Sequence, residues 1–159
     1  MGQQQLLLVI LVTILVGIAT VVAINVFGSA AENANRDAVR QDLLAASAQA
    51  QGLWTSPVML GGTGGDFAAD PPTDDQFIRR LGIAGVVTDA GTKIENENAV
   101  YTVGREEFEL TITADPKGHA GQWEMTVTRN TEEGATSAWT VEITDDQGEV
   151  TRIGQDNTT

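Results

Sequence analysis

Leu6 to Ile24 reads LLLVILVTILVGIATVVAI, and this stretch decides the fold of the chain. It contains no charged residue, and Thr13 and Thr20 are its only polar side chains. A helix of this length measures roughly 28 Å, which is close to the thickness of bilayer hydrocarbon. The stretch therefore predicts an apolar helix that is long enough to cross a membrane.

No turn signal follows the apolar stretch, and the helical pattern continues through the amphipathic segment Phe27 to Leu53. Steps of 100° per residue separate two apolar faces from a polar side that includes Ser47. The bulky stripe, which we expect to pack on a sheet, consists of Val39, Leu43, Ala46, Ala50 and Leu53. The alanine face beside it consists of Phe27, Ala31, Ala34, Ala38, Ala45 and Ala48. Two interpretations stay open: two faces that serve two partners, the chain's own domain and a neighbouring copy, or one wide face under the domain.

Pro57 ends the helix, because proline lacks the N–H that a helix interior needs. The connecting segment 54–84 is rich in glycine and proline, and its part from Leu60 to Pro72 predicts a flexible surface loop. A phosphate-binding loop would need a Lys-Ser or Lys-Thr pair after the glycines, and this segment has none. Asp75 to Leu81 predicts a short helix.

From Gly85 onward apolar and polar residues alternate with a period of two, which is typical of β-strands. The side chains expected on one apolar face are Tyr101, Val103, Phe108, Leu110, Ile112, Trp123, Met125, Val127, Trp139, Val141 and Ile143. Threonine and glutamate occupy the other face. A single antiparallel sheet needs another layer on its apolar face, and the bulky stripe supplies one. The sequence thus predicts an α+β fold with a long helix over 3–53 and an antiparallel sheet domain over 85–159.

The chain has 159 residues and a formal net charge of -13. This charge argues against nucleic acid or an anionic lipid surface as partner, and it fits either solubility or a high-salt environment. The absence of cysteine excludes disulfides and thiolate metal sites, and the single histidine, His119, excludes a histidine-cluster metal site. No catalytic constellation or cofactor motif is present, so we expect a protein without enzymatic activity and without a cofactor.

Two local features allow alternative interpretations. Asp145, Asp146 and Glu149 offer oxygen ligands to Ca²⁺, but they lack the spacing of an EF-hand, and a solvated hairpin turn is the favoured interpretation. The N-terminus resembles a signal peptide with small residues at Gly28 to Ala31, although its start is uncharged and its apolar core is unusually long. Because folded polar sequence follows only after the apolar run, we expect the N-terminus on the inner side of the membrane.

Three stretches resemble type IV pilins and the related pseudopilins: MGQQQLLLVILVTILVG at the N-terminus, LWTSPVMLGGTGGDF after the helix, and ENENAVYTV in the sheet domain. The resemblance implies that residues 1–2 are a leader, cut by a membrane peptidase between Gly2 and Gln3, and that Gln3 is then N-methylated. It implies that the apolar helices leave the membrane lipid with the help of an inner-membrane assembly machinery and pack with other copies of the chain. The implied assembly residues are Gln5, Leu6, Leu7, Leu8, Ile10, Leu11, Ile14, Leu15, Gly17, Ile18, Val21 and Val22.

The chain departs from the family pattern in two ways. The family usually carries an acidic residue a few positions after the cut, where this chain has the neutral Gln4 and Gln5. Many members also close a C-terminal loop with a disulfide, which this chain cannot form. The leading hypothesis is a structural subunit of an extracellular pilus-like filament or a secretion pseudopilus, held in the cell membrane before assembly. The alternative is a single-pass, membrane-anchored β-sheet binding domain that does not polymerise.

Overall fold

The computed structural model describes residues 2–118, 121–131 and 137–154, so His119 lies outside the described residues. The chain forms two compact units, Met1–Asn35 and Arg36–Thr159. The helix α1 (Gly2–Thr55) begins in the first unit and ends in the second, two residues beyond the predicted end. It stops before Pro57, as the missing proline N–H requires.

The first unit is helical throughout its described residues, and its few hydroxyl groups bond within the helix. Thr13 donates to the carbonyl oxygen of Ile10 and Thr20 to that of Val16, both at 2.8 Å. Hydroxyls satisfied in this way add little polarity to an apolar helix surface, which is what a helix in lipid requires. Within its apolar window, none of this helix is buried inside the structure.

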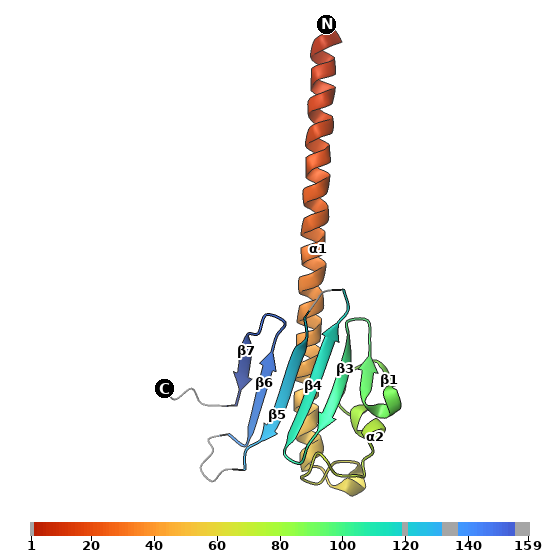
Figure 1. The fold of residues 1–159 in the computed structure, drawn as a ribbon, viewed down its shortest axis with the longest axis vertical. Helices are drawn as coiled ribbons and strands as arrows, with labels where there is room; N and C mark the ends of the chain where they lie inside the picture. Colours follow the sequence, from red (N-terminus) through yellow and green to blue (C-terminus); the bar gives the residue numbers. More distant parts are fainter. Residues whose placement is uncertain (1, 119–120, 132–136, 155–159) are drawn as a thin grey trace. The chain divides into compact units, whose positions relative to one another are not determined.

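The second unit contains a seven-stranded antiparallel sheet in which each strand pairs with its neighbours in sequence (Figure 1). The strands are β1 (Val86–Thr88), β2 (Lys93–Glu95), β3 (Ala99–Arg105), β4 (Glu109–Pro116), β5 (Trp123–Arg129), β6 (Trp139–Thr144) and β7 (Val150–Ile153). The register aligns buried side chains across the central strands, with Ile112 opposite Met125 and Met125 opposite Ile143. The predicted α+β arrangement is therefore confirmed, and β1 and β2 are two short strands whose bounds the alternation had not located.

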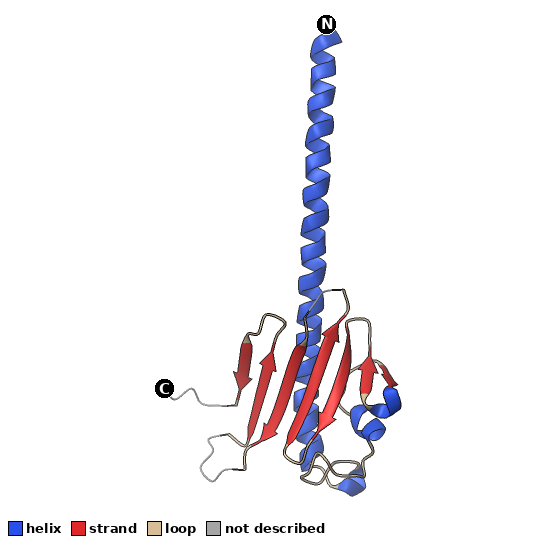
Figure 2. Ribbon diagram, viewed as in Figure 1, coloured by secondary structure: helices blue, strands red, loops and turns tan. Residues whose placement is uncertain are grey.

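One core holds the second unit together, and it lies between α1 and the sheet. Figure 2 shows the strands in red crossing the C-terminal part of α1 in blue. The helix contributes Val39, Leu43, Ala46 and Ala50, all without exposed surface. The sheet contributes Tyr101, Ala114 and five of the predicted inward residues that are buried to the same degree or nearly so: Leu110, Ile112, Met125, Val127 and Ile143. Burial of this apolar surface is the main force that joins the helix to the sheet.

The segment between α1 and β1 contains the short helices η1 (Val58–Leu60) and α2 (Asp74–Ile78), and η2 (Asp89–Gly91) follows β1. The expectation of a flexible surface loop from Leu60 to Pro72 is wrong in part. Phe67 is fully buried and Thr63 nearly so, because the glycines let the chain fold back on the end of α1. The helix α2 is shorter than the predicted Asp75 to Leu81, although Leu81 still enters the core.

Three side chains lie where the periodicity did not place them. Ser47, assigned to the polar side of the helix, is buried, and its hydroxyl donates to the carbonyl oxygen of Leu44 at 2.8 Å. That bond removes most of the cost of burying a hydroxyl. Phe108 precedes β4 and stays partly exposed, whereas Thr140, expected on the solvent face, is buried and bonded to Asn130.

Candidate functional site

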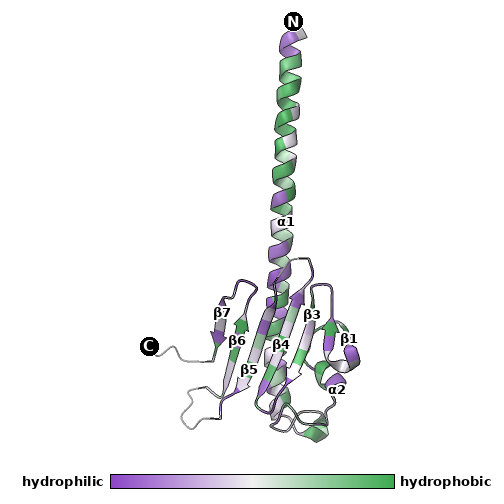
Figure 3. Cartoon of the chain, viewed as in Figure 1, coloured by the Kyte–Doolittle hydropathy of each residue, from purple (hydrophilic) through white to green (hydrophobic). Residues whose placement is uncertain are grey.

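The apolar run of α1 is the largest exposed hydrophobic surface of the described chain. Figure 3 shows it as an almost unbroken series of hydrophobic residues along the N-terminal part of the helix. Every predicted assembly residue is exposed: Gln5, Leu6, Leu7, Leu8, Ile10, Leu11, Ile14, Leu15, Gly17, Ile18, Val21 and Val22. The helix is long and apolar enough to cross a membrane. Soluble proteins rarely leave an apolar patch of this extent in water, so this surface needs lipid or protein around it.

The predicted processing site lies in the first turn of α1. Gly2 and Gln3 are both exposed, and the first turn contains no acidic residue. A carboxylate there would complement the positive end of the helix dipole. Because Gln4 and Gln5 are neutral, the described part of this turn carries no side-chain charge.

The bulky stripe and the alanine face have different surroundings. All five residues of the stripe are in the core under the sheet: Val39, Leu43, Ala46, Ala50 and Leu53. The alanine face is largely open, since Ala34, Ala45 and Ala48 are exposed and Ala38 is half-buried. The interpretation of a single wide face under the domain is therefore wrong. Besides the stripe, Ser47 and Trp54 of α1 are buried, whereas most of the alanine face stays in solvent.

A polar network fixes the helix against the sheet. Asp42 on α1 accepts hydrogen bonds from the hydroxyl of Tyr101 at 2.7 Å and from the side-chain amide of Asn96 at 3.1 Å. Burial of Tyr101, together with the adjacent carboxylate of Asp42, raises the pKa of the phenol above its usual value. The tyrosine thus stays neutral and keeps its proton as a donor to Asp42. Such a directional contact specifies one register between the helix and β3, which apolar packing alone leaves looser.

The turn between β6 and β7 gives the calcium hypothesis no support. The carboxylate of Asp145 accepts from the backbone N–H groups of Gln147 at 2.9 Å and Glu149 at 2.8 Å. Asp146, whose side chain is 1% exposed, pairs with Arg36 on α1 at 2.7 Å. Among the described residues no three carboxylate or imidazole groups gather as a metal site. The acidic residues therefore shape the turn and hold it against α1.

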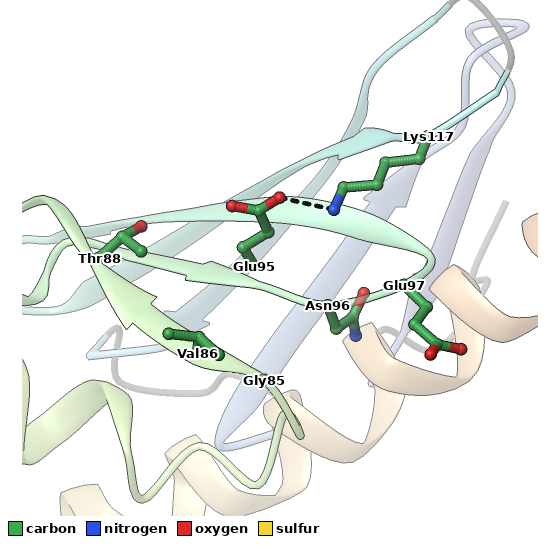
Figure 4. Close-up of a pocket in the computed structure, with 7 residues that line it drawn as sticks. All are labelled: Gly85, Val86, Thr88, Glu95, Asn96, Glu97 and Lys117. Atoms are coloured by element: carbon green, nitrogen blue, oxygen red, sulfur yellow. Dashed lines mark hydrogen bonds and ion pairs between the residues drawn. The ribbon is translucent and has the colours of Figure 1, made fainter.

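A shallow hollow at the β1 edge of the sheet is drawn in Figure 4. Its volume is about 560 Å³, and two residues of its lining, Glu95 and Lys117, form an ion pair at 2.6 Å. An exposed ion pair of this kind is solvated and contributes little to stability. The rest of the lining is Gly85, Val86, Thr88, Asn96 and Glu97. Nothing in this hollow has the arrangement of a catalytic site.

Sequence reasoning missed two features near the C-terminal end of α1. Trp54, at the end of α1, is buried in an aromatic cluster with Phe67 at 4.8 Å and Trp139 at 5.6 Å between ring centroids. The apolar side chains of η1 are exposed, although their sequence alone would suit a core.

No protein-family model, curated protein or solved structure matches this chain.

Proposed function

We propose that the chain is a structural subunit of an extracellular pilus-like filament or a secretion pseudopilus. The observation that carries the proposal is one helix with two kinds of surroundings. Its second half packs its bulky stripe under the chain's own sheet, whereas its first half exposes only apolar and neutral residues. A helix that only supported the sheet would need no exposed apolar run of this length.

The apolar run has two successive environments in this proposal. Before assembly it lies in the lipid of the cell membrane, with the sheet domain on the outer side. After assembly it packs against the same run of other copies in the centre of an extracellular filament. Because lipid is as apolar as a leucine side chain, close packing must favour the second state over the first. Gly17 suits such packing, since it has no side chain and lets the backbone of another helix approach closely.

Assembly also needs partners that act on the membrane form. In this proposal a pilin peptidase removes residues 1–2, an N-methyl group is added to Gln3, and an inner-membrane machinery extracts the subunit. The exposed first turn of α1 is accessible to such enzymes. With Gln4 and Gln5 in place of an acidic residue, the register between copies depends on side-chain packing and not on an ion pair.

The competing hypothesis is a membrane-anchored binding domain that stays monomeric. The same apolar run would serve as its anchor, so the run alone does not separate the two functions. The alanine face favours the filament, because a packed assembly uses small residues where helices approach closely.

Shearing of expressing cells tests the proposal directly. We expect thin filaments in the sheared supernatant by electron microscopy, and we expect the processed chain, which begins at Gln3, to be the main protein of those filaments by mass spectrometry. Cells that lack the gene are the control for other filaments. If the chain stays entirely in the membrane fraction while the cells are fully sheared, the filament function is wrong and the anchored domain is favoured.

The leader assignment has a separate test at Gly2. A Gly2→Phe substitution places a large side chain next to the bond that the peptidase cuts, and we expect the variant to accumulate with residues 1–2 attached. Intact-mass measurement of the purified chain reads the outcome, since the mature wild type should begin at Gln3 and carry one extra methyl group. Gln4→Phe is the matched control and should still be cut. A Gly2→Phe chain that begins at Gln3 contradicts the assignment.

A further inference from the structure

Charge is distributed very unevenly along this acidic chain. Only two long stretches lack charged side chains, Met1 to Ala31 and Leu43 to Gly65. The remaining residues carry all 22 acidic and 9 basic side chains. Copies with a net charge of -13 repel one another, so two copies approach most easily through surfaces that carry no charge.

The second uncharged stretch contains an exposed apolar tip, formed by Val58, Met59 and Leu60 of η1. The side chain of Met59 is 97% exposed, the highest value among the large apolar residues of the described chain. Val58 and Leu60 beside it are exposed as well. Large apolar side chains at such a position, grouped in a patch, indicate a contact surface more often than a structural need.

The tip is held in place by the residues around it. Thr63 and Gly65 donate from their backbone N–H groups to the carbonyl oxygens of Leu53 and Trp54 on α1, both at 2.9 Å. The guanidinium of Arg80 donates to the carbonyl oxygen of Leu60, also at 2.9 Å. Gly61 has φ 82°, a conformation that glycine adopts without strain. The loop therefore presents its apolar side chains from a fixed base.

A shallow hollow of about 630 Å³ lies beside the tip, and its lining residues carry no charge. It is lined by Trp54, Thr55, Pro57, Val58, Gly64 and Gly65. All six residues belong to the uncharged stretch from Leu43 to Gly65. We name this surface the tip hollow. Its lining of one aromatic ring, proline, valine and glycine is suited to an apolar side chain, and above all to an aromatic ring.

The first uncharged stretch contains a side chain that fits the tip hollow. Phe27 is 73% exposed, more than any leucine or isoleucine of the apolar run before it. It lies beyond Ile24, and Asn25 and Ser29 on either side make this part of α1 too polar for the lipid interior. We therefore expect a protein surface to cover Phe27, and the small residues Gly28 and Ala31 near it leave room for one.

We infer that Phe27 of one copy docks in the tip hollow of a second copy, with Met59 of the second copy covering it. The contact joins two different surfaces and is therefore heterologous, so the first copy keeps its tip hollow free and the second keeps its Phe27 free. Contacts of this type continue into open-ended helical assemblies unless the rotation closes a ring. The inference rests on the proposed filament function and names the side chains that set the register in place of a charge.

Cysteine cross-linking tests the contact in a chain that has no cysteine of its own. One chain carries Ala31→Cys, one turn from Phe27 on the same face of α1, and a second chain with an epitope tag carries Met59→Cys. Both are expressed together, and sheared filaments are treated with a short bifunctional maleimide. We expect a covalent dimer that contains one tagged and one untagged chain, and no dimer when either chain is expressed alone.

The matched control replaces Ala31→Cys by Ala45→Cys, which changes the same residue type on the same exposed face farther along α1. We expect little or no mixed dimer with it. Filaments that contain both cysteine chains but give no more mixed dimer than this control overturn the inference and leave the filament function standing. A dimer from Met59→Cys alone also overturns it, because it shows two tips in contact. Absence of any wild-type filament overturns the filament function instead.

A charge substitution gives a second and independent measurement, which decides the question if either cysteine chain is excluded from filaments. Met59→Glu buries an unpaired carboxylate in the proposed contact, and we expect the filament yield to fall by at least about tenfold. Val86→Glu is the control, since Val86 is an exposed apolar residue of similar character outside both uncharged stretches. Equal yields from the two variants overturn the inference. If the tip inserts into lipid instead of contacting a second copy, the amount of Met59→Glu chain in the membrane fraction should fall before assembly.

Discussion

Replacement of Ile14 by glutamate should abolish filament recovery after shearing. Ile14 lies in the middle of the apolar run and is exposed to whatever surrounds α1. A carboxylate at the centre of a membrane helix costs about 2.5 to 3.5 kcal/mol on insertion scales, and it must also be buried between copies in the filament. Each copy would repeat the penalty, so the filament accumulates it along its length. Quantitative immunoblotting of sheared and cell-bound fractions measures the effect.

Two controls define the meaning of this result. Gln41→Glu adds the same charge to an exposed position of the same helix, outside the apolar run, and should leave filament recovery nearly unchanged. Ile14→Leu keeps the apolar character and should assemble as the wild type does. Normal filaments from Ile14→Glu would show that the run lies outside the filament core, which contradicts the proposed function at its main support.

Replacement of Leu43 by alanine should have the largest effect on the stability of the second unit. Leu43 has no exposed surface and lies in the core between α1 and the sheet. Truncation of a fully buried leucine removes its transfer free energy and leaves a cavity, so the free energy of unfolding should fall by about 2 to 5 kcal/mol. All three tryptophans, Trp54, Trp123 and Trp139, belong to this unit, and their fluorescence in detergent-solubilised full chain follows denaturant unfolding.

The neighbouring Leu44 supplies the matched control, because the same residue type is 37% exposed there. Leu44→Ala should lower the free energy of unfolding by less than about 1 kcal/mol, as expected for a side chain largely outside the core. Equal losses for the two variants would contradict the placement of the stripe under the sheet. If α1 were rotated so that Leu44 faced the sheet in place of Leu43, Leu44→Ala would show the larger loss in free energy of unfolding.

The network around Asp42 explains why the helix and sheet adopt one register. Apolar side chains of similar size tolerate small shifts along a helix, whereas the hydroxyl of Tyr101 and the amide of Asn96 reach the carboxylate only in one arrangement. Arg36 and Asp146 make a second such contact between α1 and the β6–β7 turn. The first contact reaches Tyr101 on β3 and the second reaches the β6–β7 turn, so the helix is held to two separate parts of the sheet.

The sequence was sufficient to predict the long helix, its apolar run, the buried stripe and the alternation of the central strands. These features repeat with the periods of 3.6 and 2 residues, which backbone geometry imposes on any sequence. Absence of charge from Leu6 to Ile24 needs no tertiary context to be significant, because it decides whether a helix can lie in lipid. The most important part of the candidate functional surface could thus be predicted from residues alone.

Only the tertiary structure decided which apolar residues outside regular patterns are buried. Met59 and Phe67 follow the same helix in the same glycine-rich segment, yet Met59 is almost fully exposed and Phe67 is fully buried. This difference in exposure depends on the hydrogen bonds from the backbone N–H groups of Thr63 and Gly65 to the end of α1, and on the contact of Phe67 with the ring of Trp54. No repeating sequence pattern predicts these contacts. Local propensity carries no information on such contacts, since glycine-rich chain permits many paths and the packing around it selects one. The apolar helix was therefore determined by the sequence alone. The tip hollow was determined by the way the glycine-rich segment folds back on the C-terminal end of α1.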